Sequence, residues 1–241
     1  MSPNPDAFIT HLRTFGYHPR SDKHSNALGE AIVSDLVAHC DMIRDKAEAG
    51  KIVYDLNFTL RASTSDWNVD LVLGPPQLGY VSRVEEGGPA TRCPPSTVQI
   101  AVEIKAVMTE HRKAVKNRKR DLEAHHEHVH NYAALAIAGG VLLINASPRF
   151  KSPLRPEVST HLEPSRLVEH CVSELRGVAA RGGPRGYGLE ARCAVVVNVD
   201  NINEKEARFE TRPPAPQVGD PLHYDSFIRT ICDLYTHRFG G

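Results

Sequence analysis

Residues 97–107 have the clearest strand pattern in the chain, and they predict an inner strand of a sheet. One face of this strand carries branched apolar side chains, namely Val98, Ile100, Val102 and Ile104. The opposite face carries Gln99, Ala101, Glu103 and Lys105. Because successive side chains of a strand point to opposite faces, the apolar row indicates a face packed against a core.

Periodicity elsewhere predicts helices and further strands around this segment. Apolar residues three or four positions apart indicate helices, and short apolar or alternating runs indicate strands. The expected helices span residues 25–49, 109–138, 166–180 and 224–238. The expected strands span residues 51–60, 67–73, 97–107, 141–145 and 193–199. This order predicts a mixed α/β protein whose helices pack on a central sheet.

Glycine and proline mark the expected breaks between these elements. Gly139 and Gly140 are expected to separate the long helix from the strand that follows it. Residues 74–96 contain five Pro and four Gly, which predicts a long loop or lid. The 241 residues fit a single decorated domain.

Composition excludes several classes of protein. The longest apolar runs are far shorter than the roughly 20 residues of a membrane-spanning helix. The N-terminal residues show no basic region followed by an apolar one, so we expect no signal peptide. Five scattered cysteines without a CxxC pair favour free thiols in a reducing compartment. We therefore expect a cytoplasmic protein without a membrane partner.

Charge is balanced overall, at 29 basic and 29 acidic residues, but it is distributed unevenly. Six basic residues fall within the nine positions 112–120, namely Arg112, Lys113, Lys116, Arg118, Lys119 and Arg120. A basic block in a neutral protein indicates a surface that meets a polyanion. The alternative is an ordinary solvated helix face.

Three charged residues form the candidate chemical site. Glu103 and Lys105 share one face of their strand. Asp70 lies within another expected strand, residues 67–73, which stops at a Gly-Pro-Pro break. If the two strands are neighbours, Asp70 and Glu103 can bind one divalent cation together with the Ile104 carbonyl. Such hard oxygen ligands suit Mg²⁺. Lys105 would then orient an attacking water and offset negative charge. The alternative is a structural network of ion pairs.

These residues resemble the two acidic motifs of the PD-(D/E)XK nuclease superfamily, which includes many restriction endonucleases. Val69-Asp70 matches the first motif, with Val in place of Pro, and Glu103-Ile104-Lys105 matches the second. The resemblance implies that Asp70 and Glu103 are the metal ligands and Lys105 the catalytic lysine. It also implies an acidic residue on the first core helix, for which Glu30 is the match.

The resemblance implies a restriction-endonuclease-like fold. Its core is an αβββαβ unit with a mixed central sheet flanked by helices, covering about residues 25–145 here. Residues 146–241 would be a C-terminal elaboration. The interval of 33 positions between Asp70 and Glu103 requires residues 74–96 to be an insertion.

The function implied is a Mg²⁺-dependent endonuclease that cleaves double-stranded DNA, with Mn²⁺ as a substitute metal. A stand-alone chain of this size resembles a type II restriction enzyme acting as a homodimer. One alternative is a repair or defence nuclease without sequence specificity. Others are a non-catalytic nucleic-acid-binding module, and an unrelated α/β protein in which Glu103 and Lys105 form a structural pair.

A run of histidines between positions 125 and 130 allows a second metal hypothesis. His126 and His130 are four residues apart and would share a helix face, as two zinc ligands can. The chain has no HExxH motif, and the sequence does not place a third ligand. The alternative is a solvated helix flank or a contact surface for DNA or a second subunit.

Overall fold

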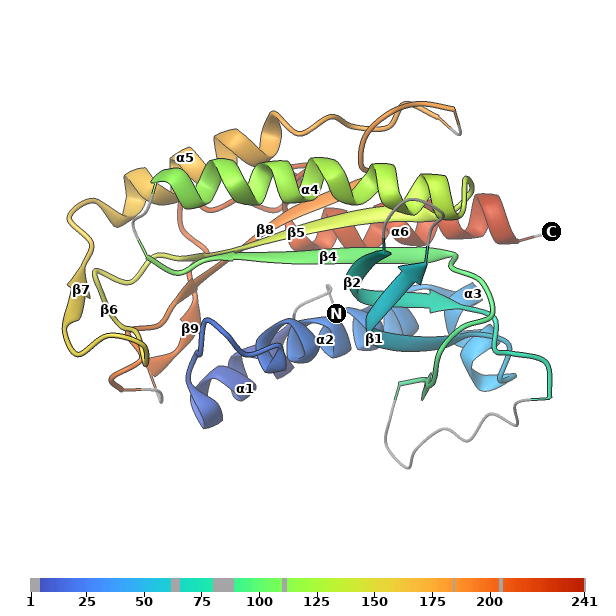
Figure 1. The fold of residues 1–241 in the computed structure, drawn as a ribbon, viewed down its shortest axis with the longest axis horizontal. Helices are drawn as coiled ribbons and strands as arrows, with labels where there is room; N and C mark the ends of the chain where they lie inside the picture. Colours follow the sequence, from blue (N-terminus) through green and yellow to red (C-terminus); the bar gives the residue numbers. More distant parts are fainter. Residues whose placement is uncertain are drawn as a thin grey trace.

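A mixed sheet of seven strands lies at the centre of the computed structural model, with helices on both faces (Figure 1). Residues 5–61, 66–79, 89–109, 112–183, 185–203 and 206–240 are described. The expected mixed α/β architecture is therefore confirmed.

The strands change direction across the sheet. In spatial order they are β3 (Thr91–Arg92), β1 (Val53–Arg61), β2 (Asp66–Gly74), β4 (Ile100–Val107), β5 (Ile137–Asn145), β8 (Ala191–Asn198) and β9 (Arg208–Phe209). Strand β2 is antiparallel to both β1 and β4, whereas β4, β5 and β8 run parallel to one another. At the two edges, β3 is parallel to β1 and β9 is antiparallel to β8. A separate two-stranded sheet pairs β6 (Arg149–Lys151) with β7 (Val158–Thr160).

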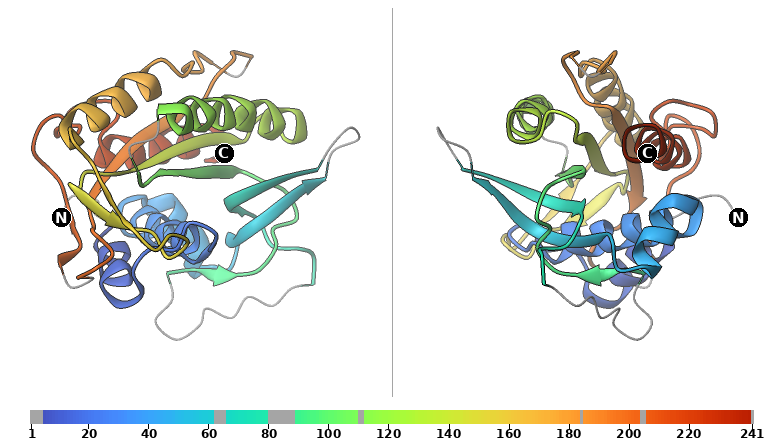
Figure 2. Two further views of the ribbon diagram at one scale, coloured as in Figure 1. Left: turned by 60° about the vertical axis from the view of Figure 1, so that its left-hand side comes forward. Right: turned by 90° about the vertical axis from the view of Figure 1, so that its right-hand side faces the viewer.

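Two helical layers enclose the sheet (Figure 2). One layer contains α1 (Asp6–Phe15), α2 (Lys23–His39), α3 (Asp41–Glu48) and α6 (Tyr224–Phe239). The other contains α4 (Arg112–Tyr132) and α5 (Pro164–Arg176). Ile100, Val102 and Ile104 of β4 pack into the first layer, as their spacing predicts. Val98 precedes the strand and packs into the second layer, so the expected apolar row is one residue too long.

The N-terminal region differs from the sequence prediction in two ways. Helix α1 was not predicted, although Phe8, Ile9 and Leu12 form its buried face. The expected single helix over residues 25–49 is two helices, α2 and α3, separated by Cys40. The backbone of Cys40 is extended, with φ −116° and ψ 101°, which interrupts the helical hydrogen bonding.

Gly139 and Gly140 lie inside β5 and do not separate a helix from a strand, so that prediction is wrong. A Cβ atom on Gly139 would lie 3.1 Å from the ring of Phe227 in α6, and one on Gly140 would lie 3.2 Å from Leu122 in α4. The glycines therefore allow helices on both faces to approach the strand closely.

The expected loop over residues 74–96 includes one short strand among its described residues, β3, which pairs with the edge of β1. Within the described ranges, no helix is long and apolar enough to cross a membrane.

Candidate functional site

The site begins where β2 and β4 part from each other. The two strands pair through Leu73 with Ile100 and through Leu71 with Val102, and the paired register ends there. Asp70 directly precedes Leu71 in β2, and its Oδ2 accepts a hydrogen bond of 2.8 Å from the Ile104 amide N–H. The carboxylate thus takes the place of a backbone partner at this fork, which brings Asp70 next to β4 at Ile104.

The pairing of β2 with its other neighbour, β1, is also irregular beside Asp70. The register between β1 and β2 passes from Leu56–Leu71 to Phe58–Val69, and Asn57 between them has a φ of 54°. The Asn57 side chain donates to Asp22 Oδ2 at 3.1 Å, at the start of α2. The break in the ladder therefore links this part of the sheet to the N-terminus of α2.

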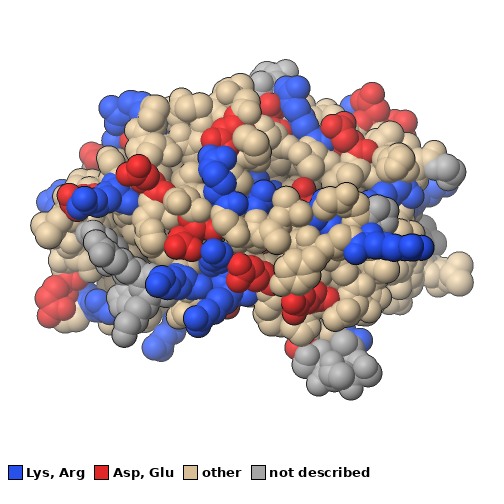
Figure 3. Space-filling model, turned by 90° about the horizontal axis from the view of Figure 1, so that it is seen from above, with Lys and Arg blue, Asp and Glu red and all other residues tan. Residues whose placement is uncertain are grey.

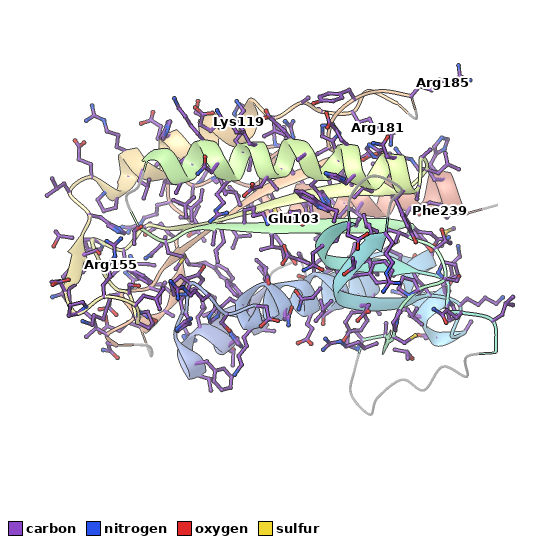
Figure 4. All side chains as sticks on the ribbon, viewed as in Figure 1. Glu103, Lys119, Arg155, Arg181, Arg185 and Phe239 are labelled. Atoms are coloured by element: carbon purple, nitrogen blue, oxygen red, sulfur yellow. The ribbon has the colours of Figure 1, made fainter. Side chains whose placement is uncertain are left out.

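Glu103 is the most deeply buried acid of the site, with 2% of the residue exposed. It lies between β4 and α4 (Figure 4). Its Oε1 forms an ion pair with Lys105, and its Oε2 lies 3.7 Å from His125 Nδ1. Neither Glu103 Oε2 nor His125 Nδ1 has a hydrogen-bond partner among the described residues. Burial, and secondly the negative charge of Asp70, raise the pKa of Glu103 to about 7.

Burial also raises the pKa of Asp70, although the Ile104 amide and the Lys105 ammonium oppose that shift. A divalent cation would relieve the desolvation and the repulsion that both carboxylates experience. In the described part of the chain, no group of three or more His, Cys, Asp or Glu residues is arranged to hold a metal. Two carboxylate ligands suit Mg²⁺, because this ion keeps several water ligands when it binds to a protein. They suit less well a metal that side chains enclose fully.

A cavity of about 180 Å³ opens beside Lys105 at the N-terminal end of α2. Its lining includes Lys105, Arg118, Tyr17, His24 and Ser25. Burial lowers the pKa of His24 to about 4 and raises that of Tyr17 to about 12, so both are uncharged at neutral pH. The positive charge of the cavity therefore comes from Lys105 and Arg118, and it suits an anionic ligand.

Glu30 occupies a different position from the other predicted site residues. Its half-exposed side chain faces Arg92 of β3, with Oε1 3.7 Å from the guanidinium nitrogen Nη1. Ser25, five residues earlier on the same helix, provides the hydroxyl that lowers the pKa of Asp70. The structure thus connects α2 to Asp70 through Ser25, while Glu30 pairs near the sheet edge.

The predicted basic block begins α4, and its members have different surroundings. The side chains of Arg112 and Lys113 lie outside the described residues. Lys116 and Arg120 are exposed. Figure 3 shows this face of the molecule, with basic and acidic side chains interspersed.

Two members of the block are paired. Arg118 Nη1 is 2.9 Å from Asp121 Oδ2, and Lys119 Nζ is 3.2 Å from Glu174 of α5. Lys119 therefore holds two helices together, whereas Arg118 also lines the cavity beside Lys105.

The histidines of α4 do not converge on one point. His128 stacks on Trp67 with 4.3 Å between ring centroids, and His126 contacts the Tyr187 ring edge-on at 4.2 Å. His130 Nε2 lies 3.1 Å from Glu190. His125 is the member that reaches the candidate site. This role of His125 cannot be read from the sequence, because the periodicity of a polar helix does not show which histidine is buried.

Comparison with family models, curated proteins and solved structures found no match.

Proposed function

We propose that this protein is a metal-dependent endonuclease of the PD-(D/E)XK class that hydrolyses DNA phosphodiester bonds. The observation that carries the proposal is the fork between β2 and β4, where Asp70 and Glu103 come together beside Lys105 and a cationic cavity. A pair of buried carboxylates with raised pKa values is costly to maintain, and such groups cluster at functional sites.

The order of elements supports the same class. Helix α2, strands β1, β2 and β4, helix α4 and strand β5 occur in the αβββαβ order that the resemblance implies, with α3 and the two-residue strand β3 as additions. The first three strands are antiparallel neighbours, and β5 lies parallel to β4. Residues 75–99 form the long connection that the spacing of the motifs requires.

Asp70 and Glu103 would hold Mg²⁺, with the Ile104 carbonyl as a third oxygen. When bound, the ion supplies Lewis-acid polarisation of a phosphoryl oxygen and a lowered pKa of bound water. Glu103 Oε2, which has no hydrogen-bond partner among the described residues, would be the ligand atom. Lys105 forms an ion pair with Glu103, and from there it can orient water and offset charge on the phosphoryl group. Arg118 adds a second cation at the cavity.

The exposed bases of α4, Lys116 and Arg120, are placed to contact the DNA backbone, and such contacts position DNA without reading its sequence. We propose double-stranded DNA as substrate, a homodimer as the active form and type II restriction in the cytoplasm as the role. A two-fold dimer would cut both strands of a two-fold site. Light scattering with and without DNA tests the dimer.

The test is cleavage of a mixed plasmid and phage DNA panel with Mg²⁺, Mn²⁺ or EDTA. Asp70→Asn and Lys105→Ala should abolish metal-dependent cleavage and retain DNA binding. Asp66→Asn, on the same strand, and Lys51→Ala are matched controls, since both wild-type side chains are exposed. Discrete fragments support restriction, and smearing supports a non-specific nuclease. Unchanged cleavage by both site variants would exclude this site.

A second measurement separates a nuclease from a non-catalytic binding module. Mg²⁺ should raise the melting temperature of the wild type and leave that of Asp70→Asn unchanged, because only the native site binds the ion. DNA binding without cleavage or Mg²⁺ stabilisation would support the binding module instead.

A further inference from the structure

Two of the five free cysteines lie together, far from Asp70 in the sequence and on other elements. Cys40 is the single residue between α2 and α3. Cys232 lies in α6, and its thiol hydrogen-bonds to the sulfur of Cys40. The pair therefore joins the break between the two N-terminal helices to the C-terminal helix.

The surroundings of Cys40 favour the thiolate. Its pKa is lowered to about 6, first by the Cys232 hydrogen bond and then by the amides of Ile43 and Met42 and the hydroxyl of Thr236, against the opposing effect of burial. Those amides belong to the first turn of α3, whose N-terminus carries partial positive charge. The pKa of Cys232 is raised by the same hydrogen bond and by burial. The hydrogen bond thus favours the thiolate at Cys40 and the thiol at Cys232.

Both cysteines line a surface cavity of about 600 Å³. Cys232 is partly exposed, whereas Cys40 is only 3% exposed and is reached from this cavity. Carboxylates and ammonium groups both line the cavity, namely Asp41, Asp45, Asp233, Lys46 and Lys51. Cys171 and Cys193 are completely buried and do not line this cavity, and burial raises the pKa of each.

We propose that Cys40 is a peroxide-reactive cysteine and that Cys232 is its resolving thiol. Redox-sensitive cysteines typically combine thiolate character, access and a neighbouring thiol. The Cys40 thiolate attacks one oxygen of hydrogen peroxide, the O–O bond breaks, and the departing hydroxide takes a proton to become water. Cys40 is then a sulfenic acid.

The Cys232 sulfur next attacks the Cys40 sulfur, the S–O bond breaks, and the leaving hydroxide takes the Cys232 proton as a second water. Two thiols are oxidised to one disulfide while one peroxide is reduced to two waters. The product ties α6 covalently to the α2–α3 junction, and a dithiol reductant restores both thiols.

The experiment is mass-spectrometric mapping of the full chain after brief exposure to hydrogen peroxide. The wild type should form a Cys40–Cys232 disulfide that dithiothreitol reverses, and Cys40 should react at least about ten-fold faster than Cys171. In Cys232→Ser, dimedone should trap the Cys40 sulfenic acid; in Cys40→Ser, Cys232 should stay reduced. Circular dichroism checks the folding of both variants.

Two outcomes would overturn the proposal, and both are read in the wild type. If Cys40 is oxidised no faster than Cys171, Cys40 is not a peroxide-reactive cysteine. Accumulation of sulfenic acid on Cys40 without a bond to Cys232 would remove the resolving role. Neither outcome depends on nuclease activity.

Discussion

Glu103 is a buried acid whose charge costs the folded protein free energy. Its pKa is raised from 4.5 to about 7, so the folded state favours the protonated form. Lys105 offsets only part of the cost, because it pairs with one oxygen, and the other has no hydrogen-bond partner in the described part of the chain. The stability that this group contributes is fully present below pH 4.5 and is lost as the pH rises through about 7.

The change Glu103→Gln should therefore remove a pH dependence. With a chelator present, the wild type should lose up to about 3 kcal/mol of unfolding free energy relative to the variant between about pH 4.5 and pH 8. Urea denaturation at several pH values measures this. Glu157→Gln, at an exposed position, is the control and should follow the wild type. Parallel curves for wild type and Glu103→Gln would show that Glu103 ionises normally.

At the scale of elements, Gly74 is the point at which β2 and the segment before β4 meet. A Cβ atom there would lie 1.9 Å from the Thr97 carbonyl oxygen. Next to it, the Gln99 amide donates to the Leu73 carbonyl at 2.9 Å. This close approach sets the register of β2 on β4, and the register in turn places Asp70 opposite Glu103.

Gly74→Ala should consequently destabilise the protein by about 2 kcal/mol or more, because the clash is with backbone and no side chain can move away. Gly182→Ala is the matched control, since nothing lies within 4 Å of its added Cβ, and it should change stability by less than about 0.5 kcal/mol. Thermal denaturation of both variants tests this prediction. Equal melting temperatures of Gly74→Ala and Gly182→Ala would contradict the close approach at Gly74.

Sequence periodicity located β1, β2, β4 and α4 because each has a long apolar pattern of one period. It missed α1, and it misread Gly139 and Gly140 as a break. Glycine is a poor strand former, and only the helices packed on the two faces of β5 explain its presence there. Local pattern does not contain that tertiary information.

The residues of the candidate site also fall into those that the sequence pattern indicates and those that it does not. The charged row of β4 pointed to Glu103 and Lys105, and the Gly-Pro-Pro break pointed to Asp70. The contacts of Ser25 and His125 with these acids come from distant elements, so the sequence could not show them. Glu30 was chosen from its helix position, whereas its partner Arg92 lies on a strand too short to recognise.

At the scale of the whole molecule, Glu190 joins segments from both helical layers. Its carboxylate accepts from Arg181 and Arg238, each at 2.8 Å, and from the Ala138 amide at 2.9 Å, while His130 lies at 3.1 Å. Burial opposes ionisation, but the hydrogen bonds from His130, Ala138 and Arg238 outweigh it and lower the pKa to about 2. The helices α4 and α6 are thus held to the start of β5 by one side chain.

Glu190→Gln should lower the unfolding free energy at neutral pH by about 3 kcal/mol, because it leaves buried cations without their counter-charge. The wild-type advantage is present above pH 4.5 and should disappear as the pH falls toward about 2. Glu163→Gln removes an exposed ion pair with Arg166 and should cost less than about 1 kcal/mol. Chemical denaturation at neutral and acid pH compares the three proteins, and equal losses in both variants would exclude this role.

The fork at Asp70 also gives the molecule a spectroscopic reporter. The Ile104 N–H donates its hydrogen bond to the side chain of Asp70 and not to a backbone carbonyl. Its proton chemical shift and its rate of exchange with deuterium therefore follow the charge and occupancy of one carboxylate. A single backbone signal in a nuclear magnetic resonance spectrum can follow events at the candidate site without substrate, label or turnover.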